Sequence, residues 1–232
     1  MAGTLSGITV PAAQRNLRVY NGSVDYWYAS GLRCDLSSNS QFDHLRVSQN
    51  NGNGLVCGNG SVLNGCSAEA NGFEGLQTGD RSTLTGCTAA NNGADGIVTG
   101  TSSTLTFCTS TGNLSPYAGF AIDQDCTIIG CSAVSNYYGI YSSSGCTIKE
   151  CTANRNSKNG ITGSSALLIV NCTACYNSGD GIACASDCLI NVNTASYNVN
   201  GIHVPPLARS TGLMATPPIT TATWASSGRT IS

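Results

Sequence analysis

Charge is scarce along this chain. Asp, Glu, Lys and Arg make up 9% of its 232 residues, and the net charge is −2. A nucleic-acid-binding protein shows a basic stripe or patch, so this composition excludes that class of partner. The sequence also lacks a long uninterrupted apolar run, and we expect neither a transmembrane helix nor a membrane partner.

Glycine, by contrast, is abundant, with 28 residues, and Asn, Ser and Thr are frequent. These residue types favour turns and strands, whereas the helix formers Glu and Lys are few. Because 41% of the residues are hydrophobic, the chain is too apolar to belong to the disordered class. The composition therefore predicts an all-β chain with one sizeable core.

A glycine followed by an apolar residue recurs about every 21 residues. The pairs are Gly31-Leu32, Gly54-Leu55, Gly75-Leu76, Gly96-Ile97, Gly119-Phe120, Gly139-Ile140, Gly160-Ile161, Gly181-Ile182 and Gly201-Ile202. A cysteine column keeps the same period: Cys66, Cys87, Cys108, Cys131, Cys151 and Cys172. An asparagine column lies five residues further on: Asn50, Asn71, Asn92, Asn113, Asn136, Asn156, Asn177 and Asn198. Self-similarity at a fixed period is the signature of a solenoid.

Each repeat is interpreted as three short strands with alternate residues pointing inward. When coils stack at roughly 4.8 Å, each side chain lies on its counterpart one turn away, so a column needs one repeated shape. Asparagine is expected to turn a corner, where its amide bonds the next Asn and the turn backbone. The glycine of each pair, such as Gly54 or Gly96, is expected to supply a backbone angle that other residues resist.

With this period and this asparagine column, residues 5 to about 204 resemble the right-handed parallel β-helix repeat family, the pectate-lyase-like superfamily. The resemblance implies a right-handed β-helix of about ten coils of roughly 21 residues, with three sheets and an asparagine ladder. We assign residues 1–204 to this domain and 205–232 to a non-repeating tail. The tail is predicted to cap the last coil or to lie over the outward apolar patch of Leu168, Val170 and Leu189, and its expected contacts are Leu207, Leu213, Ile219 and Trp224. The rival is that a second chain covers that end, giving an end-to-end or side-by-side homo-oligomer instead of a monomer.

Thirteen cysteines cannot all pair within one chain. Stacked cysteines also hold their Cβ atoms roughly 4.8 Å apart, beyond the usual reach of a disulfide. We therefore expect mostly buried thiols that act as small hydrophobes, with Cys175 pointing outward because it follows the inward Ala174. The family resemblance implies a secreted or cell-surface protein, whereas free thiols also allow a reducing compartment.

The family's polysaccharide enzymes place carboxylates, basic residues and often calcium on the outer face of the first sheet. Here the outward residues of that sheet from Val62 to Asn191 include no acid and one base, Lys149. The NTD, GHG and RIK strings of polygalacturonases are missing, as is the DPH string of alginate epimerases. No catalytic residue is assigned. Asp123 and Asp125 form the one close acidic pair and are candidates for a weak Ca²⁺ site, and no other cofactor is expected.

Aromatic residues gather on the side of the asparagine corner, where rings on a rigid ridge suit stacking on sugar faces. They are Tyr26, Trp27, Tyr28, Tyr117, Tyr137, Tyr138, Tyr176 and Tyr197. The leading hypothesis is a non-catalytic β-helix scaffold or carbohydrate-binding module with a polysaccharide partner. The alternative is a polysaccharide lyase, hydrolase or epimerase whose catalytic parts lie elsewhere. An outward Ser/Thr column from Ser67 to Thr194 leaves an ice-binding solenoid as a remote third possibility.

Overall fold

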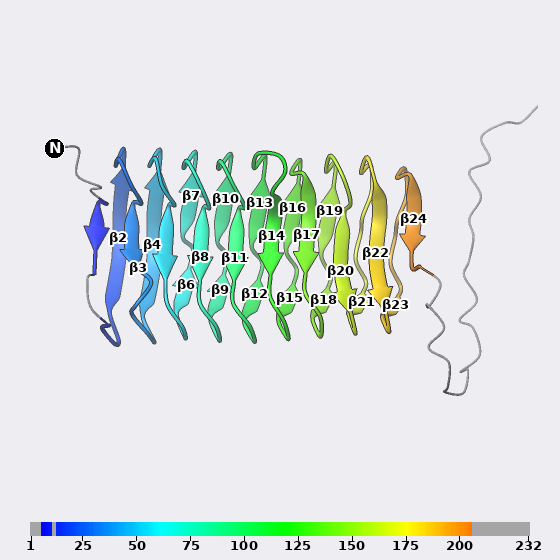
Figure 1. Cartoon of the computed structure of the whole chain (residues 1–232), viewed down its shortest axis with the longest axis horizontal. Helices are drawn as coiled ribbons and strands as arrows, with labels where there is room; N and C mark the ends of the chain where they lie inside the picture. Colours follow the sequence, from blue (N-terminus) through cyan, green and yellow to red (C-terminus); the bar gives the residue numbers. More distant parts are fainter. Residues whose placement is uncertain (1–5, 11–12, 206–232) are drawn as a thin grey trace, which may run out of the picture.

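The computed structural model describes residues 6–10 and 13–205, which form a stack of parallel β-coils (Figure 1). One face is a ten-stranded parallel sheet, called here the third sheet, with one strand from each coil. Its strands are β1 (Ile8–Thr9), β3 (Leu32–Cys34), β5 (Leu55–Cys57), β8 (Leu76–Thr78), β11 (Ile97–Thr99), β14 (Ala118–Ile122), β17 (Tyr138–Ser142), β20 (Ile161–Ser165), β22 (Asp180–Ser186) and β24 (Asn200–His203). These ten strands mark about nine full turns, which confirms the predicted parallel solenoid.

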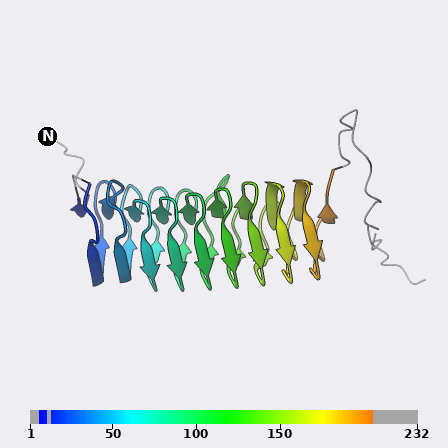
Figure 2. The same cartoon turned by 90° about the horizontal axis from the view of Figure 1, so that it is seen from below.

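The other two faces are continuous through one long strand, β4 (Gln41–Ser48), which also pairs with β2 (Arg18–Asp25). The first sheet continues from β4 as β6 (Val62–Asn64), β9 (Thr83–Thr85), β12 (Thr104–Thr106), β15 (Thr127–Ile129), β18 (Thr147–Lys149), β21 (Leu168–Val170) and β23 (Leu189–Asn191). The second sheet continues as β7 (Ser67–Glu69), β10 (Thr88–Ala90), β13 (Thr109–Thr111), β16 (Ser132–Val134) and β19 (Thr152–Asn154). The view from below shows the same regular stacking along one axis (Figure 2). In the described part of the chain no helix is long and apolar enough to cross a membrane.

The core is built from the predicted columns. Leu63 pairs in register with Leu84, and both are fully buried, as are their aliphatic counterparts up to Ile169, whereas Ile190 in the last coil is partly buried. The six-cysteine column is 0–1% exposed. Five of its thiols donate to carbonyls of the preceding coil, for example Cys66 to Phe42 at 3.3 Å. Cysteine therefore serves as a small hydrophobe with a weak donor, which confirms the inward assignment.

The asparagine ladder is present and continuous. Asn71 donates to the Oδ1 atom of Asn92 from its backbone N–H at 3.1 Å and from its side-chain amide at 3.0 Å. The same amide donates to the carbonyl of Val47 in the preceding coil at 3.0 Å. Seven of the eight Asn residues are at most 4% exposed, and only Asn198, in the last coil, is half-buried. Each amide thus satisfies buried polar groups of the turns on both sides.

The expectation about the paired glycines is wrong. Left-handed φ angles occur at three corners of every coil, mostly at residues other than glycine, such as Tyr176, Arg81 and Val192. Gly75 is required for a different reason. A Cβ atom there would lie 2.6 Å from the carbonyl oxygen of Gly96 and 2.7 Å from the ladder amide of Asn92. The repeated glycine therefore makes room for the next coil and its ladder amide.

Cys175 also departs from expectation, because it is buried and only 8% exposed. Cys175 lies two residues before the ladder residue Asn177. Ser48 lies two residues before the ladder residue Asn50 and is buried as well. Eleven cysteines are free, and Cys184 is paired with Cys188 in a disulfide whose Cα atoms are 6.6 Å apart. Most cysteines are thus thiols, as expected. The predicted tail contacts at Leu207, Leu213, Ile219 and Trp224 lie outside the described residues.

Candidate functional site

The eight predicted aromatic residues fall into three separate groups along the corner that follows the second sheet. The N-terminal group is Tyr26, Trp27 and Tyr28, and the C-terminal group is Tyr176 and Tyr197. Tyr26 and Tyr176 occupy the same corner position seven coils apart, so roughly 34 Å separates them along the axis. The third group, Tyr117, Tyr137 and Tyr138, lies between them. The aromatics therefore make three local sites instead of one continuous ridge.

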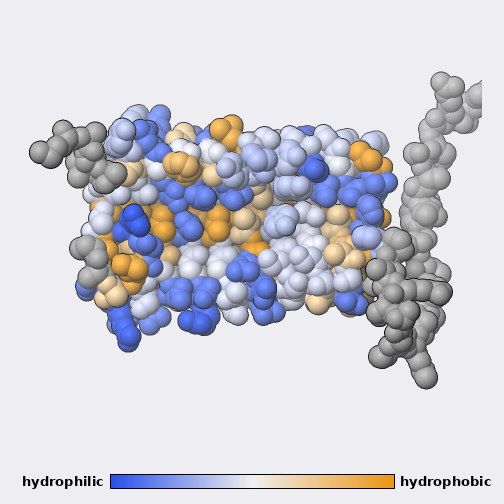
Figure 3. Space-filling model, in the orientation of Figure 1, coloured by the Kyte–Doolittle hydropathy of each residue, from blue (hydrophilic) through white to orange (hydrophobic). Residues whose placement is uncertain are grey.

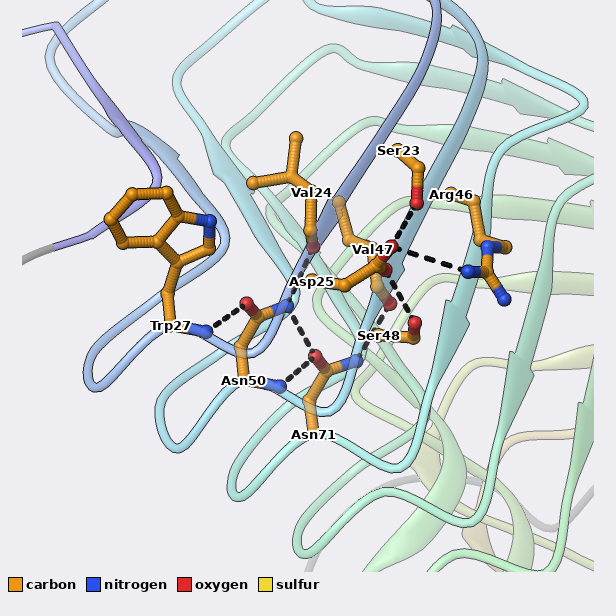
Figure 4. Close-up of polar contacts among 9 residues, drawn as sticks. All are labelled: Ser23, Val24, Asp25, Trp27, Arg46, Val47, Ser48, Asn50 and Asn71. Carbon is orange, nitrogen blue, oxygen red and sulfur yellow. Dashed lines mark hydrogen bonds and ion pairs between the residues drawn. The ribbon is translucent and has the colours of Figure 1, made fainter.

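The N-terminal group closes the ladder. Trp27 stands where later coils have a ladder Asn, and its backbone N–H donates to Oδ1 of Asn50 at 3.0 Å (Figure 4). Tyr26 and Tyr28 are 77% and 64% exposed, whereas Trp27 is 39% exposed. The indole of Trp27 packs against the backbone at Gly7, where a Cβ would lie 2.5 Å from its Nε1 atom. Trp27 is thus first a structural residue.

One carboxylate with several hydrogen-bond partners, Asp25, lies beside this group. Asp25 accepts hydrogen bonds from the hydroxyls of Ser23 and Ser48, and Arg46 Nη2 lies 3.2 Å from its Oδ2 atom (Figure 4). Burial opposes ionisation of this carboxyl, but the two hydroxyls and the Arg46 charge outweigh it and hold the pKa of Asp25 below its usual value. Both carboxylate oxygens are therefore already engaged within the coil stack.

The central group is the most concentrated. The rings of Tyr137 and Tyr138 meet edge to face, with centroids 4.9 Å apart, and Tyr138 lies 5.7 Å from Tyr141. The ammonium of Lys158 lies 5.7 Å from the Tyr137 ring and 5.8 Å from the Tyr138 ring. Tyr117 joins through its carbonyl, which accepts from the Tyr138 backbone N–H at 3.4 Å. The cluster therefore runs from the corner onto the outer face of β17.

Tyr141 and Lys158 were not predicted as site residues. Tyr141 is 48% exposed and occupies the outward position next to the inward Ile140. The sequence signal that could have identified Tyr141 was its position directly after the Gly139-Ile140 pair, where a residue points outward. Charge interactions with Tyr138 and then Tyr137 raise the pKa of Lys158, so this ammonium stays protonated at neutral pH. The site thus combines aromatic rings with one fixed cation.

In the C-terminal group the rings of Tyr176 and Tyr197 stack face to face, with centroids 4.6 Å apart and planes 2° from parallel. The guanidinium of Arg155 lies 5.9 Å from the Tyr176 ring centroid. Since Arg155, Tyr176 and Tyr197 occupy the same corner position in three successive coils, their faces cover one another. Only the far face of Tyr197 and the ring edges remain for a ligand.

Carboxylates are sparse on the outer faces of the described sheets. The outward column of the third sheet contains no acid: Arg33, Val56, Gln77, Val98, Ala121, Tyr141, Thr162, Ala183 and His203. Figure 3 shows this face, where hydrophobic and weakly polar surface follows the middle of the sheet. On the first sheet, β4 adds Asp43 to the outward residues. Its two oxygens accept from Gln41 at 2.9 Å and Asn64 at 2.8 Å.

One acid–base pair escaped the sequence reasoning. Nδ1 of His203 lies 3.1 Å from Oδ2 of Asp180, and the amide of Asn200 donates to Oδ1 of Asp180 at 2.6 Å. The pair lines a hollow of about 240 Å³ on β20, β22 and β24. Asp123 and Asp125, the calcium candidates, are exposed, and Asp123 accepts from the backbone of Gln124. Within residues 6–10 and 13–205 no three His, Cys, Asp or Glu side chains are grouped to hold a metal ion.

A stack of parallel coils joined by an asparagine ladder defines a β-solenoid. Residues 76–206, more than half of the chain, match the family model of the right-handed β-helix region. The chain belongs to this right-handed β-helix family, which confirms the resemblance and the handedness taken from it. No curated protein matches the sequence.

Two solved structures with a similar fold are mannuronan C-5 epimerase modules. The A-module of mannuronan C-5 epimerase AlgE6 from Azotobacter vinelandii has a TM-score of 0.61 and 15% identity, covering 73% of this chain and 55% of that one. The AlgE4 A-module from the same organism has a TM-score of 0.49 and 14% identity, with coverage of 82% and 56%. This chain thus spans about half the length of these modules, and at such identity the likeness shows the fold alone. Neither these comparisons nor the coil geometry supports the ice-binding alternative.

Proposed function

We propose that this β-helix binds an extended polysaccharide without cleaving it, and that the central aromatic group is the binding site. The observation that carries the proposal is the arrangement of Tyr137, Tyr138 and Tyr141 around the ammonium of Lys158. Aromatic side chains give a large apolar face with a polar tip, which suits the C–H faces and hydroxyls of a sugar. Tyr141, the most exposed of the three, offers the stacking surface.

The scaffold favours such a platform. Tyr138 and Tyr141 both belong to β17, which is paired on one side with β14 and on the other with β20. Rings held by a stacked coil lose little further freedom when a ligand binds, so less of the interaction energy is spent on ordering. Lys158 adds a protonated donor for sugar oxygens at the corner end of the same cluster.

The distribution of carboxylates supports binding without cleavage. Glycoside hydrolysis commonly uses two acids facing each other across the scissile bond. Asp25 and Asp43 each have both oxygens engaged by neighbouring side chains. The alternative of a polysaccharide-active enzyme is favoured by one observation, the Asp180–His203 pair in its hollow.

Affinity electrophoresis against neutral and acidic soluble polysaccharides tests the proposal. We expect retardation by at least one polymer, and Tyr141→Ala should weaken it roughly tenfold, the loss of one good stacking contact. Tyr20→Ala is the matched control, because Tyr20 is 67% exposed on β2, far from the cluster. No retardation by any polymer, or equal loss in both variants, would contradict the site.

The same samples distinguish the enzyme alternative. Incubation with each polymer, followed by assays for new reducing ends and unsaturated sugars, should give no product. Product that disappears in His203→Ala would instead establish catalysis at the Asp180–His203 pair. Proton NMR of the recovered polymer completes the test, because an epimerase changes sugar configuration without breaking the chain.

A further inference from the structure

The two ends of the coil stack differ. At the N-terminal end Trp27 occupies the ladder position and the backbone at Gly7 packs over Val24 and Trp27. Strand β1 then pairs with β3, so residues 6–10 add a partial coil over that end. The ladder starts at a residue whose side chain offers no amide. The chain itself therefore covers part of this end, where the inward Ile8 remains 38% exposed.

The C-terminal end is open among the described residues. Asn198 accepts from the backbone and the amide of Asn177 at 2.8 and 3.0 Å, and its own amide donates to Ala174. In every earlier ladder residue the backbone N–H donates to the next Asn, as Asn177 does here. Within residues 6–10 and 13–205, the backbone N–H of Asn198 has no such acceptor. The last rung thus has a donor to offer to another segment.

The same last coil also exposes apolar side chains. Ile202 pairs with Ile182 in register and points toward the core, yet it is 48% exposed whereas Ile182 is fully buried. Val204 of the same coil is also exposed, at 47%. Inward residues become exposed in this way only because no coil lies above them. An open core and an unpaired strand edge at the end of a solenoid require a cover.

We propose that residues 206–232 of this same chain cover the open end and supply the missing contacts. The chain leaves the stack at Pro205, directly beside Ile202 and Val204, and 27 residues follow, more than the length of one coil. The segment contains apolar residues that can bury Ile202: Leu207, Leu213, Met214, Ile219, Trp224 and Ile231. It contains no Asn, Asp, Gln or Glu, so it cannot extend the ladder with a carboxamide, and its Ser and Thr hydroxyls or carbonyls accept from Asn198 instead.

Charge and symmetry favour this occupant over a second copy. The segment carries Arg209 and Arg229 and no acid, whereas the last two coils present the exposed Asp187 and contain no Lys or Arg. A head-to-tail neighbour would bring Trp27 over Asn198, and its side chain has no acceptor for the ladder. The two ends of the stack are therefore not complementary to each other, and the tail is the occupant that fits.

Fluorine NMR of the full chain labelled with 5-fluorotryptophan tests the proposal, because Trp27 and Trp224 give the two signals and loss of one in Trp224→Phe assigns them. We expect the Trp224 signal to lie away from its position in denaturant. Ile202→Asp should move it to that position while the Trp27 signal stays, and an unchanged circular dichroism spectrum should show that the last coils also remain folded. Phe73→Asp, at a 57% exposed corner residue of a central coil, is the control and should move neither signal.

Two outcomes would overturn the proposal. In one, Trp224 already lies at its denatured position in the unmodified chain and does not respond to Ile202→Asp. In the other, the Trp224 shift depends on protein concentration and sedimentation gives twice the chain mass, which assigns the open end to a second copy. A concentration-independent shift in a monomer, abolished by Ile202→Asp, supports the tail as the cover.

Discussion

Asn92 directs two hydrogen bonds to one atom of Asn113. Its backbone N–H and its side-chain amide both lie 3.0 Å from Oδ1 of Asn113, and both residues are buried. The same amide reaches the carbonyl of Ala68 in the preceding coil at 3.3 Å. One side chain thus ties three consecutive coils together at a turn that water does not reach. The ladder is a chain of obligatory contacts, because any gap leaves buried polar groups without partners.

Removal of one rung should therefore be costly. Asn92→Ala removes the amide bond to the Ala68 carbonyl and the Oδ1 acceptor of the Asn71 backbone N–H and amide, so we expect a loss of about 1–3 kcal/mol in the free energy of unfolding. Asn51→Ala is the matched control, since Asn51 is exposed beside the ladder and does not have a left-handed φ. Urea unfolding of both variants measures the difference. If Asn92→Ala unfolds with the wild type, the ladder does not stabilise this fold.

The second prediction compares two reasons why a glycine is required: lack of space for a Cβ atom at Gly75 and a left-handed φ at Gly86. Gly75→Ala would drive its Cβ to 2.6 Å from the Gly96 carbonyl oxygen, which must shift with its whole coil. Gly86→Ala meets no heavy atom within 4 Å, although Gly86 has a φ of 60°. We expect Gly86→Ala to cost about 1–2 kcal/mol, the price of a left-handed alanine, and Gly75→Ala to cost more. If thermal unfolding shows that Gly86→Ala destabilises the protein more than Gly75→Ala, the backbone angle matters more than the space beside Gly75.

The two glycine positions also show where sequence reasoning succeeds. The period placed the six-cysteine column, the ladder and the inward aliphatic residues correctly, because a stacked coil requires the same shape at the same place in each turn. A period reports which residue recurs but not why. Gly75 and Gly86 are the same letter, yet one is required by close approach and the other by a corner angle.

The candidate site was less accessible to prediction than the fold. Tyr137 and Tyr138 were identified, but their contacts with Tyr141 and Lys158 depend on ring orientation and on neighbouring coils. Likewise, Asp180 and His203 are 23 residues apart and meet only because β22 pairs with β24. The position of a residue in the repeat predicts whether its side chain points inward or outward. It does not predict which side chain of a neighbouring coil it contacts.

Burial of the thiols predicts chemical inertness. All eleven free cysteines are buried, including Cys175, and thiolate formation is needed for alkylation. Treatment of the folded protein with iodoacetamide, followed by mass spectrometry, should leave these eleven thiols unmodified. Denaturant should expose all eleven, and prior reduction of the Cys184–Cys188 disulfide should raise the total to thirteen. Fast labelling of the Cys66-to-Cys172 column without denaturant would contradict the packing.

The final prediction concerns stability at alkaline pH. Burial, assisted by the charge of Asp35, raises the pKa of Cys34 to about 12 from an ordinary value of 9.0. Above pH 9 the unfolded chain releases this proton while the folded chain retains it, so the unfolded state binds fewer protons and stability falls with rising pH. The contribution is fully present below pH 9 and is lost progressively until the pH reaches about 12.

For one such thiol the slope reaches at most about 1.4 kcal/mol per pH unit. Cys34→Ala removes the titrating group, so its unfolding free energy should decline less steeply between pH 9 and 11 than that of the wild type. The comparison uses slopes, because loss of the buried side chain lowers stability at every pH. Tyrosines and the other thiols titrate in both proteins, and their effect cancels in the difference. Equal slopes would mean that Cys34 ionises as readily in the folded coil as in the unfolded chain.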